Sequence, residues 1–141
     1  MSVQAILLPV FAMVTVTFVL LFRTAFARRG DLKGGKVHAR DIALGQLAWT
    51  PQTQQYGNSF NNQFQLPVLF YVLMTLALIT KQADLLMVVL AWVFVVLRVA
   101  HAFIHITHNR VMRRGGTFGL GAMVLIVMWL IFAARILFAL P

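Results

Sequence analysis

Cysteine is absent from the 141 residues of this chain, and acidic side chains are scarce. Without cysteine the protein forms no disulfide, binds no metal through thiolates and has no cysteine nucleophile. The acidic residues are Asp31, Asp41 and Asp84, which against twelve Lys and Arg residues leave a formal net charge of +9. On a soluble protein such an excess indicates nucleic-acid binding. Here the basic residues flank apolar segments, so we expect them to orient the chain in a lipid bilayer and expect no nucleic-acid partner.

Apolar residues, by contrast, make up 61% of the chain, and the mean hydropathy is +0.87. A soluble domain is roughly half apolar, so this composition indicates the membrane class. A helix needs roughly 20 apolar residues to cross a bilayer core of about 30 Å. Four stretches qualify, at residues 3–26, 60–80, 84–105 and 117–140. We therefore predict an all-α integral membrane protein, with residues 1–141 forming a single up-down four-helix bundle.

The loops between these spans differ in charge. Residues 27–59 and 106–116 hold most of the Lys and Arg, whereas the second connection holds only Lys81. Basic loops stay in the cytoplasm, so we expect both of these loops there and both termini outside. Short loops and the lack of an organelle signal favour a bacterial inner membrane. Arg23 and Arg135, near the ends of spans, are interpreted as anchors that snorkel to the interface.

Residues 97–114 place polar side chains where the third span should still be in the membrane; they read LRVAHAFIHITHNRVMRR. At about 100° per residue, five of them fall within roughly one 100° arc of a helix. These are Arg98, His101, His105, His108 and Asn109. Arg98 lies about 15 Å from the cytoplasmic end of the helix. A lone arginine at that depth costs at least ~2.5 kcal/mol, so it requires a partner or water.

The second span carries a matching stripe of amides near the same side of the membrane, formed by Gln54, Asn58, Asn61, Asn62 and Gln65. Amides both donate and accept hydrogen bonds. Pro67 follows and frees the carbonyl of Gln63, which predicts a kink and a pocket. Two interpretations stay open: a polar site that opens to the cytoplasm, or buried hydrogen bonds that hold the helices together.

The start of the fourth span is rich in small residues, with Gly115 and Gly119 in a GxxxG pattern and Gly121 beyond. Such residues let helices approach closely. Arg113 and Arg114 precede this helix start, whose free amides favour anions.

The histidines also allow a metal interpretation, because His101, His105 and His108 have a spacing that can hold zinc or iron. No carboxylate lies near them in the sequence, and Arg98 one turn away would repel a cation. We therefore expect no metal.

The segment Arg98-Val-Ala-His101, followed by Arg110 and Arg114, resembles the MAPEG family, the membrane-associated proteins in eicosanoid and glutathione metabolism. The resemblance extends over nearly the whole chain, including the Asn-rich run before Pro67 in the second span. It implies a homotrimer that binds glutathione between neighbouring subunits, near the cytoplasmic surface, as a cosubstrate.

The resemblance also implies roles for individual residues. Arg98 and His101 would contact the tripeptide or order the site, and Asn61 would contribute from the neighbouring subunit. Arg110 would add positive charge. Arg114 would be the catalytic residue, because a guanidinium stabilises the glutathione thiolate and lowers the pKa of the thiol.

The chain departs from the family pattern at four positions. Gln65 stands nearest to where the family often has glutamate, His105 and Phe118 stand where it has tyrosine, and Gly115 where some members have a catalytic serine. Gln65 and His105 remain candidate glutathione contacts. The resemblance favours a glutathione-dependent transferase or peroxidase that acts on lipophilic electrophiles. The alternative is a catalytically silent membrane protein of the same fold, whose polar stripe serves assembly or binds another anionic or lipid ligand.

Overall fold

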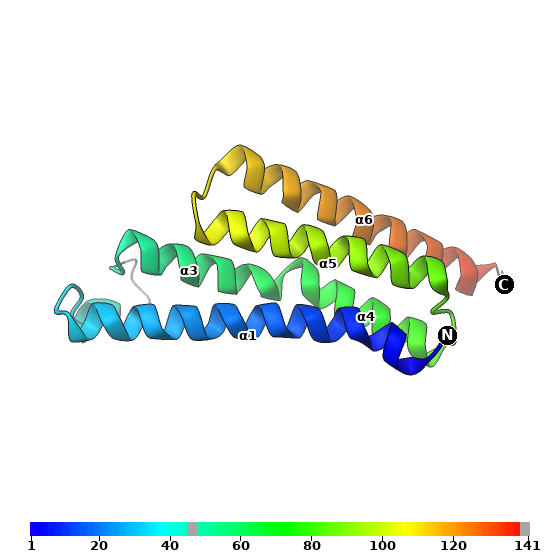
Figure 1. Ribbon diagram of the computed structural model, residues 1–141, viewed down its shortest axis with the longest axis horizontal. Helices are drawn as coiled ribbons and strands as arrows, with labels where there is room; N and C mark the ends of the chain where they lie inside the picture. Colours follow the sequence, from blue (N-terminus) through cyan, green and yellow to red (C-terminus); the bar gives the residue numbers. More distant parts are fainter. Residues whose placement is uncertain (45–47, 139–141) are drawn as a thin grey trace.

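The computed structural model describes residues 1–44 and 48–138, and every regular element in this part of the chain is helical. The elements are α1 (Val3–Lys33), α2 (Ala39–Ile42), α3 (Pro51–Asn61), η1 (Asn62–Phe64), α4 (Leu66–Ile79), α5 (Leu85–Ile106) and α6 (Val111–Leu137). Within the described residues, four helical segments are long and apolar enough to cross a membrane, with α3, η1 and α4 together forming the second. The four segments run up and down side by side (Figure 1), which confirms the predicted all-helical architecture.

The helices extend beyond the predicted spans at one end of the bundle. α1 continues to Lys33 and α3 already begins at Pro51, both inside the expected loop 27–59. α6 begins at Val111, inside the expected loop 106–116. Hydropathy marks only the apolar part of a helix, whereas Arg, Lys and Gln continue it readily into water. Positions 139 and 140 of the fourth predicted span lie outside the described residues.

The second membrane segment is broken in its middle, as the position of Pro67 predicts. Between η1 and α4, Gln65 adopts φ −101° and ψ −109°, which is not helical. Proline has no N–H and clashes with the preceding turn, so a helix stops before it and a new one starts with it in the first turn. The break therefore lies next to the polar residues of this segment.

The interior of the bundle is divided into an apolar and a polar part. Towards the end where α4 turns into α5, the core is apolar, with Phe70 and Phe94 stacked at 4.8 Å between ring centroids and methionines around them. Towards the other end, most of the buried side chains are polar, and these polar side chains come from α1, the α3–η1 segment and α5. They include Thr24, Ser59, Gln63, Arg98, His101 and His105. The outward faces are rich in exposed Val, Leu, Ile and Phe, as a lipid-facing surface requires.

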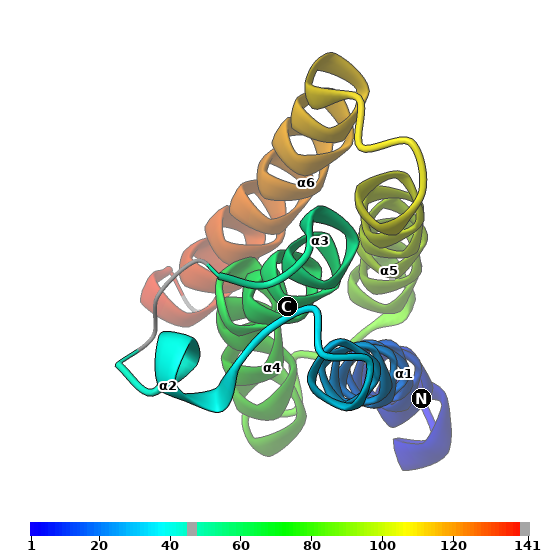
Figure 2. The same ribbon diagram turned by 90° about the vertical axis from the view of Figure 1, so that its left-hand side faces the viewer.

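One carboxylate links the two ends of the long connection between α1 and α3. Asp31, near the end of α1, accepts hydrogen bonds from the backbone N–H of Thr50 at 3.3 Å and from its hydroxyl at 2.8 Å. Thr50 is the N-cap residue of α3, and its own side chain caps no N–H group. Asp31 therefore supplies from α1 the negative charge that a helix N-terminus favours. Figure 2, which looks onto this end, shows α3 beside α1 and α5, with α2 to one side.

Candidate functional site

Arg98 is the largest fully buried side chain, with no exposed surface. Its Nη2 donates to the backbone carbonyl of Asn62 at 3.1 Å and to the Asn62 side-chain oxygen at 2.5 Å. Asn62 opens η1, three residues before the break at Gln65, and its carbonyl also accepts from the N–H of Gln65 at 3.4 Å, so the partner of the arginine lies in the interrupted part of the helix. The Nε and Nη1 of Arg98 have no hydrogen-bond partner. Only one of the three guanidinium nitrogens is therefore hydrogen-bonded, and its partners are neutral oxygens.

No carboxylate pairs with Arg98 in the part of the chain that the structure describes. Asp31 bonds Thr50, Asp41 lies 3.6 Å from Arg40, and Asp84 pairs with Arg135 at the far end. The ring of Phe118 has its centroid 5.8 Å from the Arg98 Cζ. A buried cation with two idle donors and no counter-charge is a strong attraction for an anion.

His101 lies one turn further along α5 and connects the site to α6. Its Nδ1 is 3.0 Å from the backbone carbonyl of Arg114. A carbonyl only accepts, so Nδ1 is the nitrogen that carries the proton in this contact, and in the neutral ring Nε2 is an acceptor. That Nε2 is buried and has no partner. The ring of His105 meets the ring of His101 edge-on at 5.7 Å, and its Nδ1 is also buried without a partner.

Arg114 lies in the first turn of α6 and is partly buried. Its Nη1 donates to the side-chain oxygen of Asn109 at 2.6 Å. Asn109 ends the turn after α5 and has a left-handed backbone, with φ +47°. The guanidinium of Arg114 is thus held by a neutral group, like that of Arg98.

These side chains surround a cavity of about 220 Å³. Its walls are formed by Asn62, Gln65, His101, His105, Arg114, Gly115 and Phe118. The wall residues include a cation, amides and imidazoles but no carboxylate. The cavity is therefore suited to a ligand that carries negative charge together with groups that donate hydrogen bonds.

The structure brings together five of the residues singled out from the sequence and leaves two apart. Gln65, His101, His105 and Arg114 line the cavity, and Arg98, which is not a lining residue, bonds the wall residue Asn62. Asn61 is exposed and lies outside the cavity walls, and Arg110 is an exposed residue that precedes α6. A contribution of Asn61 to a neighbouring subunit stays a prediction, as does the role of Arg110.

Two residues of the site were not assigned a role from the sequence. Asn62 was placed on the amide stripe, but nothing marked it as the partner of Arg98. Asn109 was placed on the histidine stripe, but its bond to Arg114 depends on the turn between α5 and α6. The left-handed turn has a sequence signal, since asparagine is the residue that most readily ends a helix in this conformation after glycine.

The remaining sequence features lie at the margin of the site. His108 is exposed and contacts the hydroxyl of Thr107, and no group of three or more metal-ligating side chains occurs among the described residues. Gly121 packs against α5, where a β-carbon at this position would lie 3.8 Å from the Arg98 Cδ. Gly115 and Gly119, in contrast, face open space, so only part of the small-residue surface is used within one chain.

Four apolar helical segments, three of which line a cationic cavity without carboxylates, define a polytopic integral membrane protein. The model of the MAPEG family matches residues 6–134, and the chain belongs to this family of membrane proteins of glutathione and eicosanoid metabolism. No curated protein and no solved structure matches the chain. The family assignment confirms the resemblance of the Arg98–Arg114 segment.

Proposed function

We propose that this protein binds glutathione in the cavity that Arg114 lines and that Arg98 adjoins through Asn62, and that it uses the glutathione thiolate to conjugate or reduce a lipophilic electrophile. The observation that carries the proposal is the pair of arginines held by amide oxygens with no carboxylate beside them. Family membership supports the ligand class.

Glutathione suits the polar groups that the cavity leaves idle. The tripeptide has two carboxylates, and Arg98 has two donors without partners. Charge-assisted hydrogen bonds between guanidinium and carboxylate are about twice as strong as neutral ones. The tripeptide also has an ammonium group and amide N–H groups, for which the free Nε2 of His101 is an acceptor.

Activation of the thiol falls to Arg114 in this proposal. The nucleophile in glutathione chemistry is the thiolate, and a nearby cation lowers the thiol pKa by favouring the charged form. Arg114 forms part of the cavity wall, and its bond to neutral Asn109 leaves its charge uncompensated. No tyrosine or serine hydroxyl lines the cavity, so the arginine acts without a hydroxyl donor.

The electrophile would enter from the lipid. An apolar groove of about 480 Å³ lies between α4 and α6. It begins at Leu66, next to the cavity residue Gln65, and on α6 it continues from Ala122, one turn beyond Phe118. A lipophilic molecule in this groove therefore has a path along the helices towards the polar cavity without crossing water.

The proposal includes a homotrimer in a bacterial inner membrane, with the cavity at the cytoplasmic side. In support, the basic end of α1 and the α5–α6 turn lie at the same end of the bundle, and the start of α1 and the α4–α5 turn lie at the other (Figure 1). A single chain provides only about 220 Å³, below the roughly 300–1,000 Å³ of typical ligand sites. A neighbouring subunit against the open Gly115 and Gly119 would complete the walls.

The test is the ultraviolet difference spectrum of the detergent-purified protein titrated with glutathione at neutral pH. We expect a saturable thiolate band that Arg114→Ala abolishes while the oligomer, measured by light scattering, stays intact. Arg113→Ala is the matched control, because it removes the same charge from an exposed neighbour that lies outside the cavity walls. If the wild type gives no thiolate band and calorimetry detects no glutathione binding, the alternative of a catalytically silent membrane protein with the same fold is favoured. In that case Arg114→Ala should alter only assembly.

A further inference from the structure

The turn between α5 and α6 contains a backbone conformation that side chains rarely adopt. Asn109 has φ +47°, and among the described non-glycine residues only Lys81, with φ +58°, shares this left-handed region. The N–H of Asn109 bonds the carbonyl of Ile104 at 2.8 Å, which closes the end of α5. Asparagine tolerates the left-handed region better than other non-glycine residues. The turn alone therefore explains a Gly or Asn at this position, but it does not explain the hydrogen bond that the Asn109 side chain makes.

That hydrogen bond runs from Arg114 Nη1 to the Asn109 side-chain oxygen, at 2.6 Å. The backbone of Arg114 is fixed independently: its N–H bonds the Arg110 carbonyl at 2.9 Å, and its carbonyl accepts from His101 and Thr117 at 3.0 Å each. The backbone contacts hold the first turn of α6, whereas the Asn109 amide holds the tip of the long side chain. Without the Asn109 amide, the backbone of Arg114 would stay in place, but its guanidinium would lose the hydrogen bond to the Asn109 side chain.

We propose that Asn109 is a positioning residue for the thiolate chemistry: its amide oxygen orients the Arg114 guanidinium in the cavity and leaves the positive charge uncompensated. This inference rests on the proposed function. A neutral amide differs from a carboxylate at this position in its charge. An aspartate would accept the same hydrogen bond and tolerate the same turn, but its charge would cancel that of Arg114. The other ionisable groups in or next to the cavity are Arg98, His101 and His105 on α5, while the second membrane segment contributes only the amides of Asn62 in η1 and of Gln65 between η1 and α4.

The test compares Asn109→Gly with the wild type in a pH titration of the thiolate band of bound glutathione. Glycine keeps the left-handed turn and removes only the acceptor. We expect the apparent thiol pKa to rise towards its value in Arg114→Ala, and a rise of one unit leaves about tenfold less thiolate at a pH below both values. Lys81→Gly is the matched control, because it relieves the same backbone conformation at the far end of the bundle. Its titration should coincide with that of the wild type.

Asn109→Asp separates orientation from charge. It keeps the turn and an acceptor, so the inference predicts a folded protein in which Arg114 is held but neutralised, with a raised thiol pKa. Calorimetry at a pH at which the thiol stays protonated should give unchanged glutathione binding for Asn109→Gly, because ionisation then contributes nothing to the affinity. A merely structural role of Asn109 would instead lower binding and thiolate together.

The outcomes distinguish the inference from the function on which it rests. A wild-type protein with no thiolate signal overturns both. A wild-type signal that Arg114→Ala abolishes, combined with a wild-type titration for Asn109→Gly, overturns the positioning role alone. If Asn109→Gly fails to fold, Asn109→Asp decides: a wild-type thiol pKa in that variant contradicts the role assigned to the neutral amide.

Discussion

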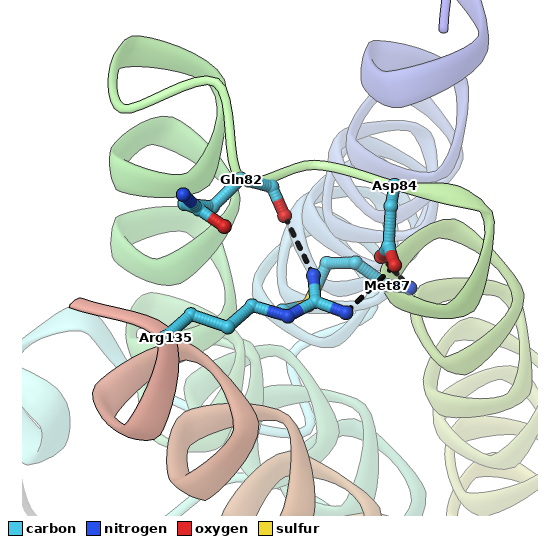
Figure 3. A network of polar contacts seen from close by, with 4 residues as sticks. All are labelled: Gln82, Asp84, Met87 and Arg135. Atoms are coloured by element: carbon cyan, nitrogen blue, oxygen red, sulfur yellow. Dashed lines mark hydrogen bonds and ion pairs between the residues drawn. The ribbon is translucent and has the colours of Figure 1, made fainter. Parts of the chain in front are cut away.

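Arg98 and Arg135, two of the arginines in the membrane-spanning helices, lie towards opposite ends of the bundle and have different hydrogen-bond partners. Arg135, in the last turn of α6, donates to the Asp84 carboxylate at 2.7 Å and to the Gln82 carbonyl at 3.1 Å (Figure 3). The same Asp84 caps α5 through the N–H of Met87 at 3.0 Å. Arg98 is completely buried, yet it has only the neutral oxygens of Asn62. The less buried arginine thus has the carboxylate, and the more buried one has none.

In the proposed function, this difference separates a structural cation, Arg135, from one that binds the ligand, Arg98. At Arg135 the pairing joins α6 to the α4–α5 turn, so the expectation that Arg135 only snorkels is wrong. The reason is that the turn brings Asp84 next to it from 51 positions away. If a carboxylate of this chain lay next to Arg98, it would neutralise the charge that the proposed ligand needs. Leaving a buried cation only partly hydrogen-bonded costs stability, and proteins keep such costs at functional sites.

The largest effect is expected from Arg98→Met, which replaces the buried charge with an apolar side chain of similar length. Glutathione binding should fall by about 2–5 kcal/mol, the range for removing one partner of a buried charge pair. Stability in detergent should stay the same or rise, because apolar replacements of buried charges are often neutral or stabilising. Calorimetry and thermal unfolding measure the two quantities. A marked fall in the unfolding temperature would show that Arg98 is instead structural, as Arg135 is.

Asn62→Asp makes the surroundings of Arg98 resemble those of Arg135. The substitution places a carboxylate oxygen where the amide oxygen now lies, 2.5 Å from Nη2. We expect glutathione affinity to drop at least about tenfold, or roughly 1.4 kcal/mol, because the internal carboxylate competes with the ligand. Asn58→Asp, on the exposed side of α3, is the control for the added charge. Equal losses in the two variants would mean that the general field, and not the pairing at Arg98, weakens binding.

Much of the arrangement around the two arginines can be predicted from the sequence, but the hydrogen bonds that distinguish them cannot. Helical periodicity places Arg98, His101 and His105 on one face, and Pro67 predicts the break opposite them. The choice of Asn62 over Asn61 depends on how the chain leaves the helix through Gln65, and a rotation of one residue turns a side chain by about 100°. The Asp84–Arg135 pair had a usable signal, since the predicted topology places both at the outer surface. The Asn109–Arg114 bond requires the exact path of the turn.

Arg135→Met removes the structural cation and provides the converse of Arg98→Met. It leaves Asp84 and the Gln82 carbonyl without their partner, but both can be reached by water at this end of the bundle. We expect the free energy of unfolding to fall by about 1 kcal/mol, typical of a partly exposed pair, with glutathione binding unchanged. Lys81→Met, an exposed neighbour on the same turn, controls for the lost charge. A loss of glutathione binding in Arg135→Met would contradict the separation of the two arginines.

The smallest expected effect is a pH dependence of the free energy of unfolding, which arises from the Asp84 carboxylate. The hydrogen bond from Arg135 lowers the pKa of Asp84 below its ordinary value of 3.8. The unfolded chain therefore binds the proton first as the pH falls. The stabilisation is complete above the ordinary pKa and is lost as the pH falls through the lower folded-state value. Because Asp84 is largely exposed, we expect only about a few tenths of a kcal/mol.

Unfolding temperatures of the wild type and Arg135→Met, measured from neutral pH down to about pH 3, isolate this contribution, because the two proteins differ only at position 135. The difference between the two curves should shrink only at the acid end. Arg98→Met should show no such convergence, because no carboxylate pairs with Arg98 in the described chain. Parallel curves for Arg135→Met would mean that the ion pair does not stabilise the turn. The stabilising contact of Arg135 would then be its hydrogen bond to the Gln82 carbonyl.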